Sequence, residues 1–554
     1  MPLAIGTHIL SCDTLLRVRT LLALAAVPFL LRADTYPRQP GVDVLHYSIQ
    51  LSLGDGADEI SGETAIRVRF IQANVREVTF DLAALTDGRG MSVSSIAMSG
   101  RPLPFTHRPD NKLVITLPAA PEVQSRVEFV VRYQGSPRIF KPAKGLSIAQ
   151  NRHGDRTFYA LNWPDGAREW FPCIDHPYEK ATSEMRVTAP SRYQVVSNGL
   201  LQEETDLGNG TRVTHWKQSV PISTWLITLG VAQFAVKHYG PATGIPLETW
   251  VAWQDRHQAA VTFELPARRA IAFFSEFVGP YPYERLANII AAGLSGGTEH
   301  ASAIFYGERT IADRPATNLV AHEIAHQWFG DSVTESDWDD VWLSEGFATY
   351  FTLLYTEHYA GRDAFVEGLN RSRRTVLEAE KKMPGQPVIH NNLSDMRRVL
   401  NQLVYQKGGW VLHMLRELTG RDAFQQGIRE YYKHYRDANA STDQFRRVME
   451  EASGQELRWF FDQWLKRAGS PVLEVKWRWD AGARQVTGEI VQSQPGDPYR
   501  LQVELSSEKG QVQKIDLTAK TQRFSYASES DPGELKLDPN TNLLFEGKIV
   551  RERQ

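Results

Sequence analysis

The chain has 554 residues, more than one hydrophobic core normally supports, so several domains are expected. Its composition, 42% hydrophobic, 23% charged and 10% aromatic, is that of an ordinary folded protein and excludes a disordered or fibrous chain. Lys and Arg number 62 and Asp and Glu number 65, which leaves a formal net charge of -3 and no strong field to attract polyanions. We therefore expect no nucleic-acid partner.

The N-terminus carries an apolar run from Leu21 to Leu31, preceded by Arg17 and Arg19, which is the layout of a signal peptide. The run is shorter than the roughly 20 residues of a membrane-spanning helix. We predict that residues 1–33 are a signal peptide cleaved near Ala33, and that the protein is exported to the periplasm or the extracellular space. After cleavage it is not expected to be an integral membrane protein. The alternative is a buried N-terminal helix.

The two cysteines, Cys12 and Cys173, are too few for a disulfide framework and wrongly spaced for a cysteine zinc site. Cleavage near Ala33 removes Cys12 and rules out an intrachain disulfide. Any metal site must therefore use His and carboxylate ligands.

Residues 34–240 are predicted to form an N-terminal β domain, because apolar and polar residues alternate there with period two. The alternating apolar positions are Tyr47, Ile49, Leu51 and Leu53, followed by Ile66, Val68 and Phe70. A Gly- and Pro-containing cluster at 240–246 marks the expected boundary.

Residues 241–468 are predicted to be mainly helical, because apolar residues recur there at helical spacing. The clearest runs are Thr317 to Phe329, Phe347 to Tyr359, Val404 to Leu418 and Phe445 to Leu465. After Ser470 and Pro471 the period-two pattern returns, so residues 469–554 are predicted to form a small β-sandwich. The fold class is therefore multidomain α+β.

The segment His322-Glu323-Ile324-Ala325-His326 places two imidazoles four residues apart on one face of a helix, where both can bind one ion. Catalytic zinc uses three protein ligands and leaves the fourth position to water. Glu345 is the expected third ligand, because it is a lone carboxylate in an apolar stretch and a metal compensates its burial. The alternatives are a solvated helix face for the two histidines and an N-terminal helix carboxylate for Glu345.

These residues lie in HEIAHQWFGDSVTESDWDDVWLSEGFATY, which resembles the zinc signature of the M1 family of aminopeptidases, gluzincin relatives of thermolysin. With further matches and the domain order β, helical, β, the resemblance covers nearly the whole mature chain, from about 40 to 550. The further matches are Ala167-Arg168, Phe171-Pro172-Cys173, Asp175, Pro177, Lys180-Ala181-Thr182 and Tyr405-Gln406-Lys407-Gly408. The resemblance implies a thermolysin-like catalytic domain with one Zn²⁺ per chain. Glu323 is then the base that accepts a proton from the attacking water.

The glycine-rich segment of the family is matched by Gly296-Gly297-Thr298-Glu299-His300. By resemblance, Glu299 binds the free α-amino group of a peptide substrate, and Gly296 and Gly297 let the peptide run beside an edge strand. Thr298 and His300 depart from the family pattern. Without the resemblance, this segment would be interpreted as a surface turn.

Two further positions are interpreted through the same resemblance. Tyr405 is expected to stabilise the oxyanion, although an aromatic residue on an amphipathic helix is otherwise usually core. Many family members carry Gln and Glu just before the position of Ala167, where this chain has the run Leu161 to Asp165. Asn162 is the one residue there that could substitute for the Gln. The resemblance therefore does not imply which N-terminal side chain of the substrate is preferred.

The predicted function is that of a zinc-dependent aminopeptidase acting on peptides. A zinc endopeptidase that no longer demands a free amine, and a non-catalytic peptide-binding scaffold, are the alternatives. The chain ends soon after the third predicted domain, so we expect no C-terminal helical domain and a more open cleft. Nothing in the sequence indicates the oligomeric state.

Overall fold

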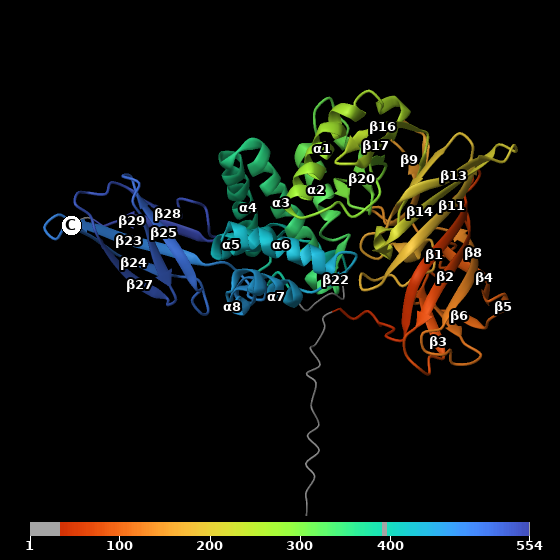
Figure 1. Ribbon diagram of the computed structural model, residues 1–554, viewed down its shortest axis with the longest axis horizontal. Helices are drawn as coiled ribbons and strands as arrows, with labels where there is room; N and C mark the ends of the chain where they lie inside the picture. Colours follow the sequence, from red (N-terminus) through yellow and green to blue (C-terminus); the bar gives the residue numbers. More distant parts are fainter. Residues whose placement is uncertain (1–33, 390–395, 553–554) are drawn as a thin grey trace, which may run out of the picture.

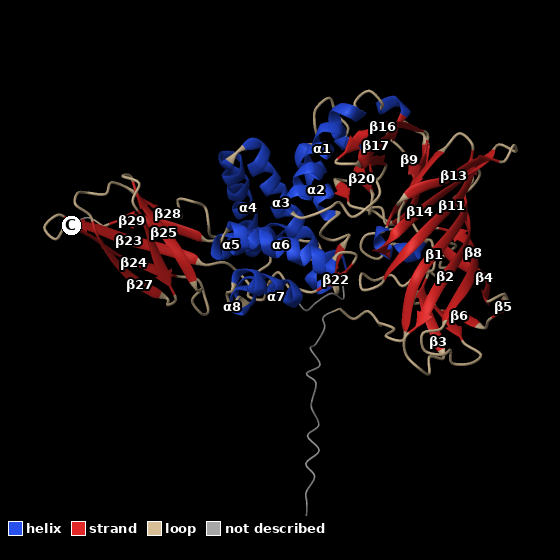
Figure 2. Ribbon diagram, viewed as in Figure 1, coloured by secondary structure: helices blue, strands red, loops and turns tan. Residues whose placement is uncertain are grey.

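The computed structural model describes residues 34–389 and 396–552, which form three regions in chain order along the long axis of the molecule (Figure 1). A β-rich region comes first, a mainly helical region lies in the middle, and a second β-rich region follows (Figure 2). The predicted signal peptide, residues 1–33, lies outside the described residues. No helix in the described part of the chain is both long and apolar enough to span a membrane.

The N-terminal region is built on an eight-stranded sheet with the order β13-β14-β11-β1-β2-β8-β4-β5. Its strands in chain order are β1 (Val42–Ser52), β2 (Ile60–Phe70), β4 (Gly90–Met98), β5 (Arg101–Pro102), β8 (Arg126–Ser136), β11 (Lys180–Pro190), β13 (Leu200–Asp206) and β14 (Thr211–Ser223). A three-stranded sheet contains β3 (Glu77–Asp81), β6 (Phe105–His107) and β7 (Lys112–Thr116). A four-stranded sheet contains β9 (Gly145–Gln150), β10 (Arg156–Leu161), β12 (Gln194–Ser197) and β15 (Leu229–Ala232).

The alternation in β1 and β2 places one face of the large sheet in the core. Tyr47, Ile49, Ile66 and Val68 are fully buried. Cys173 is a buried free thiol, and burial raises its pKa well above the usual range. It is therefore a packed apolar side chain and not a nucleophile.

The middle region contains a five-stranded sheet that the helical pattern did not predict. Its order is β16-β17-β18-β20-β19, with bounds β16 (Phe234–Ala242), β17 (Ile245–Ala252), β18 (Leu286–Ala291), β19 (Gly297–Thr298) and β20 (Ala303–Gly307). The predicted boundary at 240/241 lies within β16. All six residues of β18 are buried, as expected of a parallel strand covered on both faces.

Helices make up most of the rest of the middle region (Figure 2). They are α1 (Ala259–Phe277), α2 (Thr317–His326), α3 (Trp342–Ala360), α4 (Arg362–Lys382), α5 (Gly408–Thr419), α6 (Arg421–Tyr435), α7 (Thr442–Ser453) and α8 (Arg458–Leu465). A two-stranded parallel sheet joins β21 (Val333–Glu335) to β22 (Ala438–Ala440).

Single 3₁₀ turns occur in both the N-terminal and the middle region. They cover Ala167–Glu169, Thr224–Leu226, Trp253–Asp255, Glu308–Thr310, Trp338–Asp340 and Met396–Arg398.

Two predicted helical runs differ in detail from the structure. The run Phe445 to Leu465 is divided between α7 and α8, because Gly454 takes a left-handed conformation (φ 68°) that ends α7. Residues Leu403–Lys407 form a π-helical turn before α5, a rare conformation that often marks functional positions. Tyr405 lies in this turn.

The C-terminal region has a four-stranded sheet, β27-β24-β23-β29, and a three-stranded sheet, β26-β25-β28. The strands are β23 (Val472–Asp480), β24 (Gln485–Gln492), β25 (Leu501–Ser507), β26 (Val512–Leu517), β27 (Thr521–Ala527), β28 (Leu535–Leu537) and β29 (Glu546–Arg551). Leu473, Val475 and Trp477 are buried on one face of β23, as the alternation predicts.

Polar contacts join the first two regions close to the metal-binding motif. Lys180 in β11 donates hydrogen bonds to the main-chain oxygens of Asp331 (3.0 Å) and Ser332 (2.7 Å). Arg38 donates to the Ser336 oxygen (2.6 Å) and to Asp337 (3.0 Å). The loop between α2 and α3 is therefore fixed by the N-terminal region.

Candidate active site

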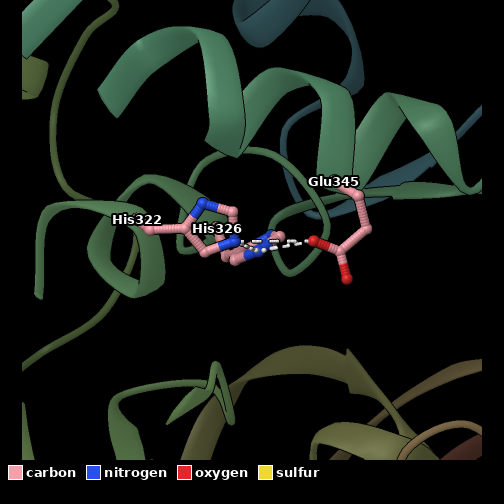
Figure 3. A group of neighbouring side chains, drawn as sticks. All are labelled: His322, His326 and Glu345. Atoms are coloured by element: carbon pink, nitrogen blue, oxygen red, sulfur yellow. Dashed lines mark hydrogen bonds and ion pairs between the residues drawn. The ribbon is translucent and has the colours of Figure 1, made fainter. Parts of the chain in front are cut away.

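The three predicted metal ligands converge on one point (Figure 3). His322 and His326 lie one turn apart on α2, and their Nε2 atoms are 3.2 Å from each other. Glu345, in the first turn of α3, places Oε2 3.5 Å from Nε2 of His322 and 3.3 Å from Nε2 of His326. Helix spacing supplies the first two ligands, and packing of α3 against α2 supplies the third.

These separations fit a single zinc ion. Ligand atoms that each lie about 2.0 to 2.2 Å from a tetrahedral ion are roughly 3.3 to 3.6 Å apart. Oε2 of Glu345 is buried and has no hydrogen-bond partner in the described part of the chain, so a metal accounts for it. His322, His326 and Glu345 are thus the residues that would hold the metal.

The tautomer of His326 also suits a metal ligand. Its Nδ1 lies 3.2 Å from the Phe329 oxygen, an obligatory acceptor, and 3.0 Å from Oγ of Ser344. Nδ1 therefore carries the proton, and Nε2 is left with a lone pair for the metal. Ser344 was not predicted, although its place directly before Glu345 was a usable signal.

Electrostatics around the ligands favour a cation. Burial alone would raise the pKa of Glu345, but His326 and His322 outweigh it and lower the pKa to about 2. Burial, with the Glu299 and Glu345 carboxylates, raises the pKa of Glu323 well above its usual value. Three buried carboxyl groups lie beside two imidazoles, and a divalent ion among them would stabilise their ionised forms.

Glu323 and Glu299 lie next to the ligand cluster. An oxygen of each lies within 4.8 Å of the other and of a ring nitrogen of His326. Both side chains are almost fully buried, and Oε1 of Glu299 has no hydrogen-bond partner among the described residues. Glu299 therefore offers a free acceptor beside the position expected for the metal.

The two predicted glycines lie where a side chain would interfere. Gly297 starts β19, which pairs with β20 on one side and forms the edge of the five-stranded sheet. A Cβ atom at Gly297 would lie 2.3 Å from Oε1 of Glu323. Gly296 has a φ of 89°, a conformation that L side chains rarely adopt. Both positions let the edge strand run close to Glu323.

Tyr405 also lies at this site. Its ring faces that of His322, with ring centroids 6.2 Å apart. Burial, together with the Glu345 carboxylate, raises the pKa of Tyr405 well above its usual value. The hydroxyl therefore keeps its proton and is a hydrogen-bond donor beside Glu345.

Neither His300 nor Asn162 is placed to bind substrate. His300 is fully buried against Phe305, and burial lowers its pKa to about 3. Asn162 is also fully buried, donates to the Ile227 oxygen and accepts from Nε1 of Trp170 (2.9 Å). Asn162 is therefore a structural residue that does not substitute for the family's Gln.

A second His and Asp group lies away from this centre, where Asp34, His176 and Asp337 place side-chain atoms within 4.8 Å of one another. Nδ1 of His176 accepts from the Tyr178 N–H (3.2 Å), so Nε2 carries the proton and donates it to Asp34. A protonated Nε2 does not bind a metal. This group therefore serves as a polar contact between regions.

Sequence models of two related domains match this chain. The Peptidase M1 N-terminal domain matches residues 43–226, and the Peptidase family M1 domain matches residues 263–464. The chain belongs to peptidase family M1. The multidomain architecture with an N-terminal β domain and a catalytic domain is that of the M1 family, and Zn²⁺ is the cofactor that membership implies.

Curated relatives of this M1 protein include a glutamyl aminopeptidase of Bitis rhinoceros, 31% identical over 326 residues, which are 56% of this chain and 34% of the relative. The glutamyl aminopeptidase of Homo sapiens is 31% identical over 330 residues, with the same shares. The chain matches about a third of the length of these relatives.

Solved structures match over more of the chain. An M1 zinc metallopeptidase from Deinococcus radiodurans has a TM-score of 0.68 and 25% identity, covering 78% of this chain and 96% of that one. A mutant of the same enzyme bound to the substrate Tyr-Ser-Ala has a TM-score of 0.67 and 27% identity, covering 77% and 94%.

Proposed function

We propose that this M1 family member is a zinc-dependent aminopeptidase that removes N-terminal residues from peptides. The observation that carries the proposal is the position of Glu299, whose carboxylate lies within 4.8 Å of both Glu323 and His326. An acid this close to the metal ligands can bind the α-ammonium of a peptide only if the first peptide bond lies at the centre. That geometry selects an exopeptidase.

Each residue then has a defined task. Glu299 binds and orients the substrate amine. Glu323 accepts the proton of the attacking water and passes it to the leaving amine. The hydroxyl of Tyr405 donates to the carbonyl oxygen as negative charge develops on it. His322, His326 and Glu345 would hold the zinc ion, which when bound would supply a Lewis acid and lower the pKa of the attacking water to about 7.

The known relatives support this proposal. Curated relatives about 30% identical are named glutamyl aminopeptidase, and the Deinococcus radiodurans structure contains a Tyr-Ser-Ala substrate. Their named substrates differ, so we propose peptides with a free N-terminus as the substrate class without assigning a preferred side chain.

The experiment compares aminoacyl fluorogenic substrates with their N-acetylated counterparts, with and without a zinc chelator. An aminopeptidase cleaves only the free amines and loses activity with the chelator. Glu299→Gln, which removes the charge but keeps the shape, should lower kcat/KM for free amines by about 10- to 100-fold while zinc stays bound. Cleavage of blocked substrates by the unmodified protein would favour the endopeptidase. No cleavage by zinc-loaded protein would favour the scaffold.

We also propose that the protein is exported after cleavage near Ala33, because Leu21 to Leu31 have the length and flanking residues of a signal peptide. N-terminal sequencing of the protein purified from its native host tests this.

We propose in addition that the middle region is a thermolysin-like catalytic domain and that a separate β-sandwich domain begins at about residue 469.

A further inference from the structure

Gln327 directly follows the metal ligand His326 at the end of α2 and is fully buried. Its side-chain amide takes part in four hydrogen bonds. Oε1 accepts from the Ser302 N–H (2.8 Å) and lies 3.1 Å from the Tyr281 hydroxyl, whose single proton is shared with the Arg285 main-chain oxygen (3.2 Å). Nε2 donates to the Glu299 main-chain oxygen (2.9 Å) and to Oδ2 of Asp331 (2.7 Å).

The orientation of this amide is fixed by its partners. The Ser302 N–H can only donate, so the atom facing it is Oε1, and the Glu299 oxygen can only accept, so the atom facing it is Nε2. Both protons of the amide are therefore used, and its oxygen accepts from the Ser302 N–H and shares the proton of Tyr281. A buried amide that is fully satisfied holds its neighbours in one arrangement, since any rotation would leave a buried group unpaired.

The amide ties the chain that carries Glu299 to the helix that carries the metal ligands. A tight turn from His300 to Ala303 joins β19 to β20, and in it the Ala303 N–H donates to the His300 oxygen (3.0 Å). Glu299 directly precedes this turn, and Ser302 lies within it. Oε1 of Glu299 is buried without a partner of its own among the described residues. The position of the carboxylate is therefore set by its main chain, and Gln327 bonds to that main chain at Glu299, just before the turn, and at Ser302, within it.

The same amide extends the connection to the N-terminal region. Asp331 receives the second Nε2 hydrogen bond, and Lys180 of β11 donates to the main-chain oxygen of Asp331. A continuous path of hydrogen bonds thus runs from the N-terminal sheet through Asp331 and Gln327 to Glu299.

We propose that Gln327 is a positioning residue that fixes the Glu299 carboxylate relative to the metal ligands and so sets the enzyme's demand for a free N-terminal amine. This inference rests on the proposed function, in which Glu299 binds that amine. Gln327 does not touch the substrate. Substitution of Gln327 shifts the Glu299 carboxylate without removing it, and a misplacement of about 1 Å can lower the rate around 100-fold.

The test uses two variants of the full-length zinc-loaded protein. Gln327→Glu keeps the shape and the acceptor for Ser302 but removes both donors, and it faces the Glu299 oxygen and Asp331 with a carboxylate. Gln327→Met keeps the length and removes all four hydrogen bonds. Tyr281→Phe is the matched control, because it removes one bond to Oε1 and leaves the bond to the Glu299 oxygen in place. Zinc content and melting temperature are measured for each protein, and kinetics only on folded holoprotein.

For both Gln327 variants we expect KM for free-amine substrates to rise about 10- to 100-fold with a smaller change in kcat, at unchanged zinc content. Selectivity for free over N-acetylated substrates should fall by a similar factor, and Tyr281→Phe should keep it. A merely structural role would lower the folded fraction or kcat and leave KM and the selectivity unchanged. If neither Gln327 variant folds, Gln327→Asn is measured in the same way.

The two levels of the proposal fail separately. If the unmodified protein selects free amines and the Gln327 variants keep that selectivity and KM, only the role of Gln327 is overturned. If the unmodified protein does not select free amines, the aminopeptidase proposal is overturned, and the role of Gln327 with it.

Discussion

The phenol ring of Tyr405 lies nearly parallel to the imidazole of His322, with ring centroids 6.2 Å apart and an interplanar angle of 19°. Tyr405 lies in the π-helical turn Leu403–Lys407. Hydrogen bonds fix the last residue of this turn: Nζ of Lys407 donates to Glu380 (2.8 Å) and to the Gly469 oxygen (2.7 Å). The orientation of Tyr405 is thus linked to α4 and to the segment that enters the C-terminal region.

Tyr405→Phe removes the hydroxyl and keeps the ring against His322. We expect kcat to fall by about 100- to 1,000-fold, the usual cost of losing one oxyanion donor, with zinc content and KM little changed. Steady-state kinetics with metal analysis measures this. Tyr526→Phe in β27, far along the chain from the site, should leave kcat unaltered. A Tyr405→Phe protein with full kcat would remove the hydroxyl from the mechanism.

Glu323→Gln keeps the shape of the base and abolishes its ability to accept a proton. Because Glu323 is not among the three converging ligands, zinc should remain bound at one ion per chain, while kcat falls by at least about 100- to 10,000-fold. Metal analysis beside kinetics separates the two effects. A variant that loses zinc as well as activity would show that Glu323 contributes to metal binding, and normal turnover would refute its role as the base.

The local parts of this site could be predicted from the sequence. His322 and His326 share a helix face whatever the rest of the fold does, because their separation is one helical turn. Glu345 could be predicted for a different reason, because a single carboxylate in an apolar stretch needs a partner. Both inferences use only neighbouring residues.

Features that depend on distant contacts could not be predicted in this way. Asn162 was a candidate for the amine pocket, but its partner Ile227 lies 65 positions along the chain and holds it in the core. Gln327 bonds to Glu299 across 28 positions. Strand β18 was missed because all six of its residues are buried, so it shows no alternation that separates a strand from a helix.

Gly297→Ala tests the close approach of the edge strand to Glu323. The added Cβ would lie 2.3 Å from Oε1 of Glu323, so the carboxylate must move. We expect kcat to fall by about 10- to 100-fold, because a base displaced by roughly 1 Å no longer meets its proton. Gly54→Ala, where a Cβ would meet nothing within 4 Å, is the control. Equal kcat in the two variants would mean that Glu323 has room to shift without cost.

Glu335 provides a test of stability against pH. Both of its carboxylate oxygens are buried without a hydrogen-bond partner in the described part of the chain, and burial raises its pKa from 4.5 to about 8. The folded protein therefore holds this proton between about pH 4.5 and 8, where the unfolded chain has lost it. The contribution of this proton to the free energy of unfolding is fully present below pH 4.5 and is lost as the pH rises through 8.

Glu335→Gln removes this titration, so the variant should gain stability relative to the unmodified protein as the pH rises from 5 to 9. Each pKa unit corresponds to about 1.4 kcal/mol, so the gain should be readily measurable as a shift in melting temperature. Melting curves at pH 5, 7 and 9 on zinc-loaded protein measure it, with Glu122→Gln at an exposed position as the control. Because Glu335 has no hydrogen-bond partner to lose, the variant should fold. Parallel pH profiles for Glu335→Gln and the unmodified protein would show that the buried carboxylate is already neutralised by its surroundings.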